Sequence, residues 1–209
     1  MKIFTQFFKS ILLTTGCFCF FIHSQAQNWE INLLENINPS QPNSTFWKGA
    51  SSSVYPFAIA SPLSMLTIGY LQKDKSMQDK GWKNVGSLII NTAITQGLKY
   101  SINRERPYQK YPLQIHPYQI ENDASFPSGH TSTAFTTAAS LSIHFKKWYV
   151  IVPAYAWATS VGYSRMYLGE HYPSDVLVGA AIGTGSAYLS QWLYEKMFVT
   201  KKKKNVSIR

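Results

Sequence analysis

Five charge-poor runs of 15 to 19 residues constrain the fold of this 209-residue chain more than any other feature. They lie at Val54–Leu71, Asn84–Leu98, Thr131–Phe145, Trp148–Ser164 and Val176–Tyr194. Each run is rich in Ala, Leu, Ile, Thr and aromatic residues and is too long for a typical strand, so each predicts a buried or membrane-embedded helix. The runs therefore indicate an all-α bundle, and the length of the chain suits one domain.

The first 26 residues have the pattern of a secretory signal peptide. Lys2 and Lys9 precede an apolar stretch, residues 11–22, that is too short to span a bilayer comfortably. Ser24 and Ala26 supply small residues at the −3 and −1 positions, which predicts cleavage after Ala26. Both cysteines of the chain lie inside this segment, so the exported protein is expected to have neither disulfides nor thiolate metal sites.

The charge of the exported chain favours an anionic partner. Without the two lysines of the signal peptide, 18 basic residues face 10 acidic ones, a formal charge of +8. That balance suits nucleic acid, an anionic membrane or an anionic substrate, and export argues against nucleic acid. Residues 27–53 carry no motif, and residues 197–209 form a basic C-terminal tail.

Two clusters of polar residues lie between the second and third runs. Lys99 and Arg106 frame the stretch KYSINRERP, and if the helix persists, both cations lie on one of its faces. In FPSGHTS, Ser128 and Gly129 form a turn, and a helix is expected to start near His130. Because a helix N-terminus exposes unpaired amides and a partial positive charge, this turn is a candidate anion site.

A third cluster, SRMYLGEHYPSD, precedes the last run. Pro173 suits the first turn of a helix, so Asp175 is expected to lie in that turn and to reach a ring nitrogen of His171. A carboxylate there fixes the tautomer and leaves the other nitrogen as a nucleophile or base. Together with Arg165, the clusters supply what phosphoryl transfer needs: cations, an in-line nucleophile and a proton donor. Each group also has a purely structural interpretation, as a snorkelling cation or a helix cap.

The three clusters resemble, in order, the signature motifs of the type 2 phosphatidic acid phosphatase (PAP2) superfamily, which also contains bacterial acid phosphatases and vanadium haloperoxidases. KYSINRERP fits Lys-x6-Arg-Pro, FPSGH fits Pro-Ser-Gly-His, and SRMYLGEHYPSD fits Ser-Arg-x5-His-x3-Asp. Every signature position is filled, and the resemblance covers about residues 54–196. Three ordered motifs with fixed spacing are a far stronger signal than one tetrapeptide.

The resemblance implies a helical bundle and a mechanism without metal or cofactor, through a phosphohistidine. It implies that His171 attacks phosphorus while Asp175 orients the ring, and that His130 protonates the departing oxygen and then activates water. The phosphate would be held by a set of donors: Lys99, Arg106, Ser128, Gly129 and Arg165.

We therefore expect an exported phosphatase whose substrate is a lipid phosphate or diphosphate, such as phosphatidic acid, undecaprenyl diphosphate or a lipid A phosphate. One alternative is a soluble exported acid phosphatase without substrate specificity. A vanadate-dependent haloperoxidase and a non-catalytic lipid-binding protein are further alternatives, because a shared fold alone does not fix the chemistry.

The lysines predict a topology with five membrane-embedded helices. If the motifs meet at one end of the bundle, the opposite end collects Lys73, Lys75, Lys80, Lys83, Lys146, Lys147 and Lys201–Lys204. By the positive-inside rule this lysine-rich end is cytoplasmic, so the site faces the periplasm of a bacterial inner membrane. Several runs are near or below the ~17-residue limit for spanning, so a soluble or peripheral periplasmic bundle is the alternative.

Overall fold

The structure is a computed structural model that describes residues 29–199. These residues form helices, turns and loops and contain no strand, as the five runs predict. The elements are a helix over residues 29–37, α2 Thr45–Ser52, α3 Val54–Leu71, α4 Lys75–Ile102, α5 Pro107–Lys110, α6 Gly129–Phe145, α7 Trp148–Tyr167, α8 Pro173–Tyr194 and a π-helical turn, Glu195–Val199. The predicted signal peptide and the lysines Lys201–Lys204 lie outside the described residues.

Each of the five predicted runs lies within one long helix. The first run coincides with α3, and α8 begins at Pro173, where the proline suits the first turn. α4 begins well before its run because Asp74 caps it: the Asp74 carboxylate accepts hydrogen bonds from the backbone N–H groups of Ser76 at 2.8 Å and Met77 at 3.2 Å. α4 therefore includes residues 75–83, about two polar turns, which a search for apolar runs does not detect.

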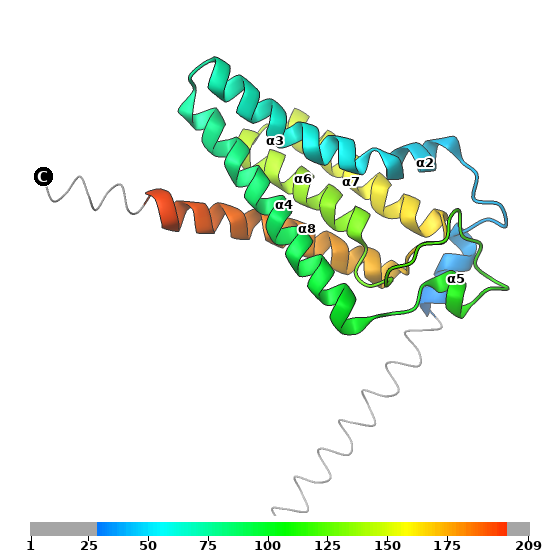
Figure 1. Cartoon of the computed structure of the whole chain (residues 1–209). Coiled ribbons are helices and arrows are strands. Elements are labelled where there is room, and N and C mark those ends of the chain that lie inside the picture. The colour runs from blue at the N-terminus through cyan, green and yellow to red at the C-terminus, as the bar shows by residue number, and fades with distance from the viewer. Residues whose placement is uncertain (1–28, 200–209) are drawn as a thin grey trace, which may run out of the picture.

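α6 lies at the centre of the bundle and contacts α3, α4, α7 and α8 (Figure 1). α5 and the loop of residues 111–128 gather at one end, which we call the α5 end. The α3–α4 turn lies at the opposite end (Figure 1), where Lys80 of α4 approaches the ring of Phe145 at the end of α6. The topology therefore brings the C-terminus of α4 and the N-termini of α6 and α8 together at the α5 end.

α6 and α8 pack with their backbones almost in contact. A Cβ atom at Gly179 would lie 2.8 Å from the carbonyl oxygen of Ser128, and one at Gly183 would clash with the carbonyl oxygen of Ser132. Small residues at such positions let helices approach closely, which is common in membrane bundles. The close approach also joins the first turns of the two helices, where the Ser128 N–H donates to the Asp175 carbonyl at 3.1 Å.

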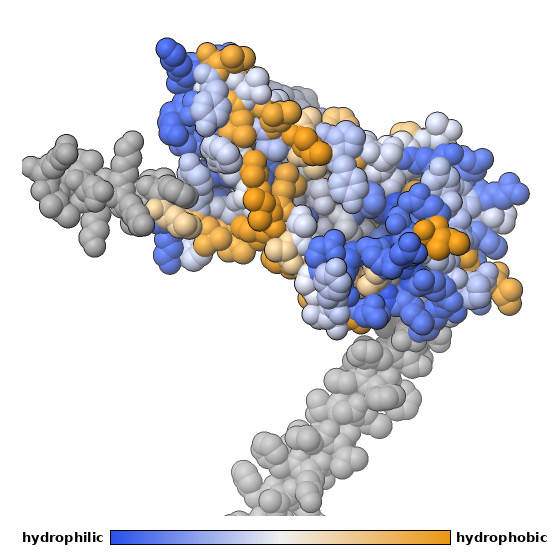
Figure 2. Space-filling model, in the orientation of Figure 1, coloured by the Kyte–Doolittle hydropathy of each residue, from blue (hydrophilic) through white to orange (hydrophobic). Residues whose placement is uncertain are grey.

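The helices bury small and polar side chains and expose large apolar ones. The buried polar side chains on α4, α6, α7 and α8 are Asn84, Ser87, Asn91, Thr95, Thr131, Ser132, Thr136, Thr137, Ser140, Ser164, Ser186 and Ser190. The exposed apolar side chains include Phe57, Ile59, Leu63, Trp82, Ile89, Val152, Leu177 and Leu189. Figure 2 shows apolar side chains gathered over the middle of the helices and polar ones at the α5 end. This distribution is opposite to that of a water-soluble bundle and suits a lipid environment.

Of the helices in the described part of the chain, α3 alone passes a test of length and mean hydropathy for crossing a membrane, and only 28% of that segment is buried. The buried Asn, Ser and Thr side chains lower the mean hydropathy of the other helices without facing outward. Mean hydropathy therefore understates how apolar the outer surface of the bundle is.

Residues 29–53, in which the sequence shows no motif, pack beneath the loops at the α5 end. The Asn38 side-chain N–H group donates to the carbonyl oxygens of His116 and Tyr167, both at 2.9 Å, and its Oδ1 accepts from the His116 N–H at 2.7 Å. An apolar cluster holds the same region: Ile31, Leu34, Tyr108 and Ile115. The segment is thus part of the framework that supports the loops.

The α6–α8 contact generates a first prediction. Gly183→Ala should lower the stability of the folded protein by about 1–3 kcal/mol, because the added methyl group forces two backbones apart. Thermal unfolding followed by circular dichroism in detergent measures this as a lower Tm.

Gly185→Ala is the matched control, since a Cβ atom at Gly185 meets no atom within 4 Å. Both substitutions raise helix propensity equally, so only the clash distinguishes them. Equal Tm values for the two variants would contradict the assigned packing.

Candidate active site

The residues of the three motifs meet at the α5 end of the bundle (Figure 1). Lys99 lies in the last turn of α4, Ser128 precedes α6 as its N-cap, and Arg165 lies in the last turn of α7. His171 occupies the turn before α8, and Asp175 lies in the first turn of α8 as the sequence predicts. Four long helices therefore position one cluster of side chains.

α4 does not continue to Arg106, so the condition under which Lys99 and Arg106 would share one helical face is not met. The helix ends at Ile102 because Asn103 adopts a left-handed conformation, with φ 46° and ψ 48°. The two cations instead meet at the carboxylate of Asp123. Its Oδ2 lies 3.1 Å from the Lys99 ammonium, and its Oδ1 accepts a hydrogen bond from the Arg106 guanidinium.

Carboxylates alternate with the three cations of the site. Glu170 Oε2 lies 3.3 Å from Arg106 Nη1 and 3.8 Å from Arg165 Nη2, and Glu121 Oε1 lies 3.8 Å from the same Arg165 nitrogen. Lys99, Arg106 and Arg165 are each at most 5% exposed. Because a buried charge is costly unless it is paired, the carboxylates make this concentration of positive charge possible.

Arg165 is also held by the N-terminal segment. Its Nη1 donates a hydrogen bond to Ser51 Oγ at 2.6 Å. Its buried Nε has no hydrogen-bond partner within residues 29–199. Buried N–H groups are nearly always paired, so this donor is available to an anion at the site.

His171 and Asp175 form a buried pair. His171 Nδ1 lies 3.6 Å from Asp175 Oδ2, which is an ion-pair distance rather than a direct hydrogen bond. The same oxygen accepts hydrogen bonds from Ser125 Oγ at 2.5 Å and from the Tyr172 N–H at 3.0 Å. Burial lowers the pKa of His171 to about 3, although Asp175 opposes the shift. The imidazole is therefore neutral near pH 7, as a nucleophile must be.

The turn before α6 brings an amide and a hydroxyl to the cations. A Cβ atom on Gly129 would lie 3.9 Å from Cε of Lys99, so the N-terminus of α6 lies beside the lysine. Ser128 Oγ shares a hydrogen bond of 2.8 Å with Thr131 Oγ1, which fixes its direction. The free amides at this helix N-terminus add donors for an anion.

His130 lies on the first turn of α6, beside the other site residues. Its ring packs edge-on against Tyr55 of α3, with 5.1 Å between the ring centroids. It lies near the Arg165 guanidinium and the His171 ring. The structure thus brings together all eight residues that the motifs single out.

Several residues at the site were not predicted from the sequence. Asp123 and Ser125 lie within three residues before the FPSGH stretch, and Glu170 directly precedes His171. Arg104 lies inside the first motif, where it donates a hydrogen bond of 2.6 Å to Asp175 Oδ1. The chain has few charged residues, so a charged residue beside or inside a motif could have been predicted to belong to the site.

The arrangement can bind a tetrahedral oxyanion and present a nitrogen nucleophile to it. Guanidinium groups match phosphate oxygens with two parallel hydrogen bonds, and an ammonium group adds a point charge. In the described ranges, no group of three His, Cys, Asp or Glu side chains could hold a metal ion. Lys99, Arg106 and Arg165 supply positive charge for an anion at this end of the bundle.

Residues 80–198 match the family described as the PAP2 superfamily. The chain is 31% identical over 153 residues to a lipid A 1-phosphatase of Porphyromonas gingivalis. That alignment covers 67% of this chain, but the chain spans only 29% of the length of that relative.

Two solved structures share the fold. The crystal structure of Aquifex aeolicus LpxE superposes with a TM-score of 0.62 and 25% identity, covering 78% of this chain and 94% of that one. A transmembrane PAP2-type phosphatidylglycerolphosphate phosphatase from Bacillus subtilis superposes with a TM-score of 0.53 and 27% identity, covering 81% and 78%. Because the family match spans more than half of the chain and includes all three motifs, the chain belongs to the PAP2 superfamily.

Proposed function

We propose that this protein is a metal-independent phosphatase that hydrolyses a phosphomonoester or diphosphate of a membrane lipid. The observation that carries the proposal is the concentration of three buried cations beside a neutral, carboxylate-paired histidine at a helix N-terminus. The names of the relatives support the lipid substrate class, since one is a lipid A 1-phosphatase and another a phosphatidylglycerolphosphate phosphatase.

The phosphate of the substrate binds Lys99, Arg106 and Arg165 and displaces the carboxylate of Asp123. The Asp123 side chain is 52% exposed, so it regains water when it moves away from the cations. The Glu170 side chain is fully buried, so it stays in place and orients both arginines. The unpaired Nε of Arg165 gains a partner when the anion binds.

Phosphoryl transfer then proceeds in two steps. Nε2 of His171 attacks phosphorus in line, the bond from phosphorus to the lipid oxygen breaks, and His130 donates a proton to that oxygen. Asp175 stabilises the positive charge that develops on the phosphorylated ring. In the second step, His130 takes a proton from a water molecule that attacks phosphohistidine, which releases phosphate and neutral His171.

We also propose that α3, α4, α6, α7 and α8 are embedded in a membrane, with the α5 end outside the cytoplasm. The helices are 17 to 28 residues long, longer than most of the apolar runs, so each reaches the ~17-residue limit. Their outward-facing apolar side chains and the lysines at the opposite end support this topology.

The central experiment measures phosphate release by the purified protein in excess chelator. Lipid A, undecaprenyl diphosphate, phosphatidylglycerol phosphate and phosphatidic acid serve as substrates. We expect His171→Ala to lower kcat by about three orders of magnitude or more, because it removes the nucleophile.

His116→Ala is the control for this variant, because His116 is bound through its backbone, which the substitution keeps. If a folded His171→Ala variant retains more than a few per cent of wild-type turnover, His171 is not the nucleophile. Loss of wild-type activity in chelator, restored by added magnesium or zinc, would rule out the metal-independent mechanism.

The role of His130 predicts a dependence on the leaving group. His130→Ala should slow hydrolysis of an alkyl phosphate about 100-fold or more and that of an activated aryl phosphate far less, since only a poor leaving group needs the proton. Steady-state kinetics on a matched alkyl and aryl pair measures the difference. Equal losses on both substrates would remove His130 from this role.

The topology predicts that the protein stays in the membrane fraction after extraction with high salt or carbonate and is released by detergent. Leu113 is 91% exposed at the α5 end, and the thiol of Leu113→Cys should react in intact spheroplasts with a reagent that does not cross membranes. The thiol of Ser76→Cys, at the opposite end, should react only after lysis. Release of active protein by carbonate, or the reverse labelling pattern, would contradict the topology.

A further inference from the structure

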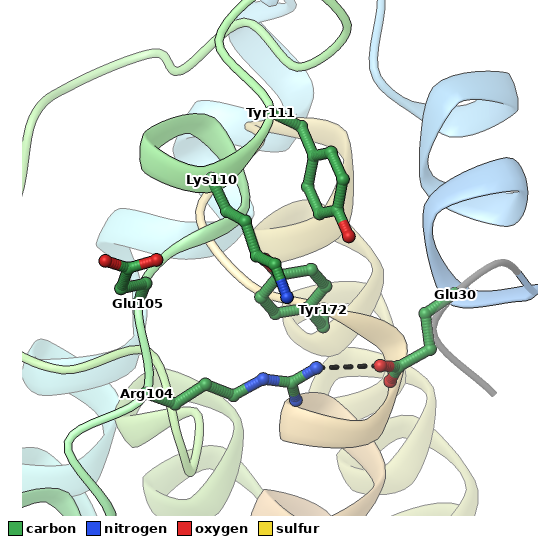
Figure 3. A pocket seen from close by; sticks show the side chains of 6 residues that line it. All are labelled: Glu30, Arg104, Glu105, Lys110, Tyr111 and Tyr172. Carbon is green, nitrogen blue, oxygen red and sulfur yellow. Dashed lines mark hydrogen bonds and ion pairs between the residues drawn. The ribbon is translucent and has the colours of Figure 1, made fainter. Parts of the chain in front are cut away.

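A pocket of about 180 Å³ opens beside Arg104, on the side of the N-terminal helix (Figure 3). Its lining residues are Glu30, Arg104, Glu105, Lys110, Tyr111 and Tyr172. The guanidinium of Arg104 points toward Glu30 across this pocket (Figure 3). Because Arg104 also bonds to the fully buried carboxylate of Asp175, it separates that carboxylate from the pocket.

Arg104 donates hydrogen bonds from both terminal nitrogens of its guanidinium group. Nη1 donates to Asp175 Oδ1 at 2.6 Å and to Ser174 Oγ at 2.7 Å, and Nη2 donates to Glu30 Oε2 at 2.7 Å. The guanidinium also stacks on the ring of Tyr172, 3.9 Å from the ring centroid. A planar cation with this many partners has one orientation, which lysine could not reproduce.

Glu30 connects the N-terminal helix to the same network. Its Oε1 accepts a hydrogen bond of 2.9 Å from the Ser174 N–H, a free donor of the first turn of α8, while Oε2 holds Arg104. The Glu30 side chain is only 8% exposed. Glu30 thus fixes Arg104 and the first turn of α8 relative to each other.

We propose that Arg104 is a positioning residue for the phosphatase reaction: it holds Asp175 Oδ1, so that Oδ2 faces His171, and Glu30 holds Arg104. This inference rests on the proposed function. The two oxygens of Asp175 have separate partners. Oδ1 accepts a hydrogen bond from Arg104, whereas Oδ2 accepts hydrogen bonds from Ser125 and Tyr172 and faces the His171 ring. Removing Arg104 leaves Oδ1 without its charged partner, so that only the hydrogen bonds to Oδ2 still orient the carboxylate.

Arg104 also favours the ionised form of Asp175. A fully buried carboxylate without a cation tends to bind a proton, and a protonated Asp175 no longer presents a negative charge to the Nδ1 side of His171. The charged and titratable groups that act on the pair are Glu30, Lys99, Arg104, Arg106, His130, Arg165 and Tyr172. Only Arg104 among the cations bonds directly to Asp175 in the described structure.

The first test compares Arg104→Ala, Arg104→Lys and the control Glu105→Gln, which changes a residue of the same pocket wall. For Arg104→Ala we expect kcat to fall about 10- to 100-fold with KM nearly unchanged, because the residue does not touch the phosphate. The acid limb of the pH–kcat profile should move up by about one pH unit, since Asp175 and His171 then bind protons more readily. Arg104→Lys should restore the acid limb but only part of kcat.

The open pocket permits a chemical rescue. Guanidinium ion at millimolar concentration should recover part of the activity of Arg104→Ala, whereas tetramethylammonium, which has the charge without the planar fork, should not. Neither ion should affect Glu105→Gln. An Arg104→Ala variant with an unchanged acid limb and no response to guanidinium would overturn the inference.

A measurement without substrate separates this inference from the proposed function. In the wild type at pH 7, ¹⁵N shifts of His171 should show one neutral tautomer with the proton on Nδ1, and in Arg104→Ala they should show a mixture. If the wild type releases no phosphate from any lipid but the tautomers change, the proposed function fails and the positioning of His171 by Arg104 stands. Identical ¹⁵N shifts in the folded variant would overturn the positioning role whatever the activity.

Discussion

The rest of the site depends on how three positive charges are kept close together away from water. At low dielectric, Lys99, Arg106 and Arg165 repel one another strongly, so each needs a carboxylate within a few ångströms. This requirement explains the long irregular loop of residues 111–128, which carries Glu121 and Asp123 to the cations. The loop in turn needs a support, which residues 29–53 provide through Asn38 and the apolar cluster beneath it.

The packing of the helices also shapes the site at the α5 end of the molecule. α6 and α8 approach through Gly179 and Gly183, so their N-termini start side by side and the FPSGH turn faces the first turn of α8. Small residues are necessary for this geometry, and small polar residues are plentiful along the interface. The resulting bundle has a polar interior and an apolar surface, so packing and environment are consistent with each other.

The sequence predicted what depends on local rules. The five helices, the start of α8 at Pro173 and the meeting of the three motifs required only apolar runs, a proline and signature spacing. It left open how far α4 continues: the apolar run ends at Leu98, and Asn103, a residue type that readily adopts the left-handed conformation, ends the helix before Arg106. Glu30 and Ser51 were also missed, because their partners Arg104 and Arg165 lie far away in the sequence, and such contacts leave no local pattern.

Asp123 gives the site a way to change anions without a loss of charge balance. Its carboxylate is half exposed and pairs with both Lys99 and Arg106, whereas Glu170 is buried and permanent. In the proposed reaction, the Asp123 carboxylate can return to Lys99 and Arg106 while the product anion leaves. The two cations then keep a counter-charge throughout the exchange. An aspartate carried on this loop would in that reaction compete with orthophosphate for the two cations, and this competition would shorten the time for which the product occupies the site.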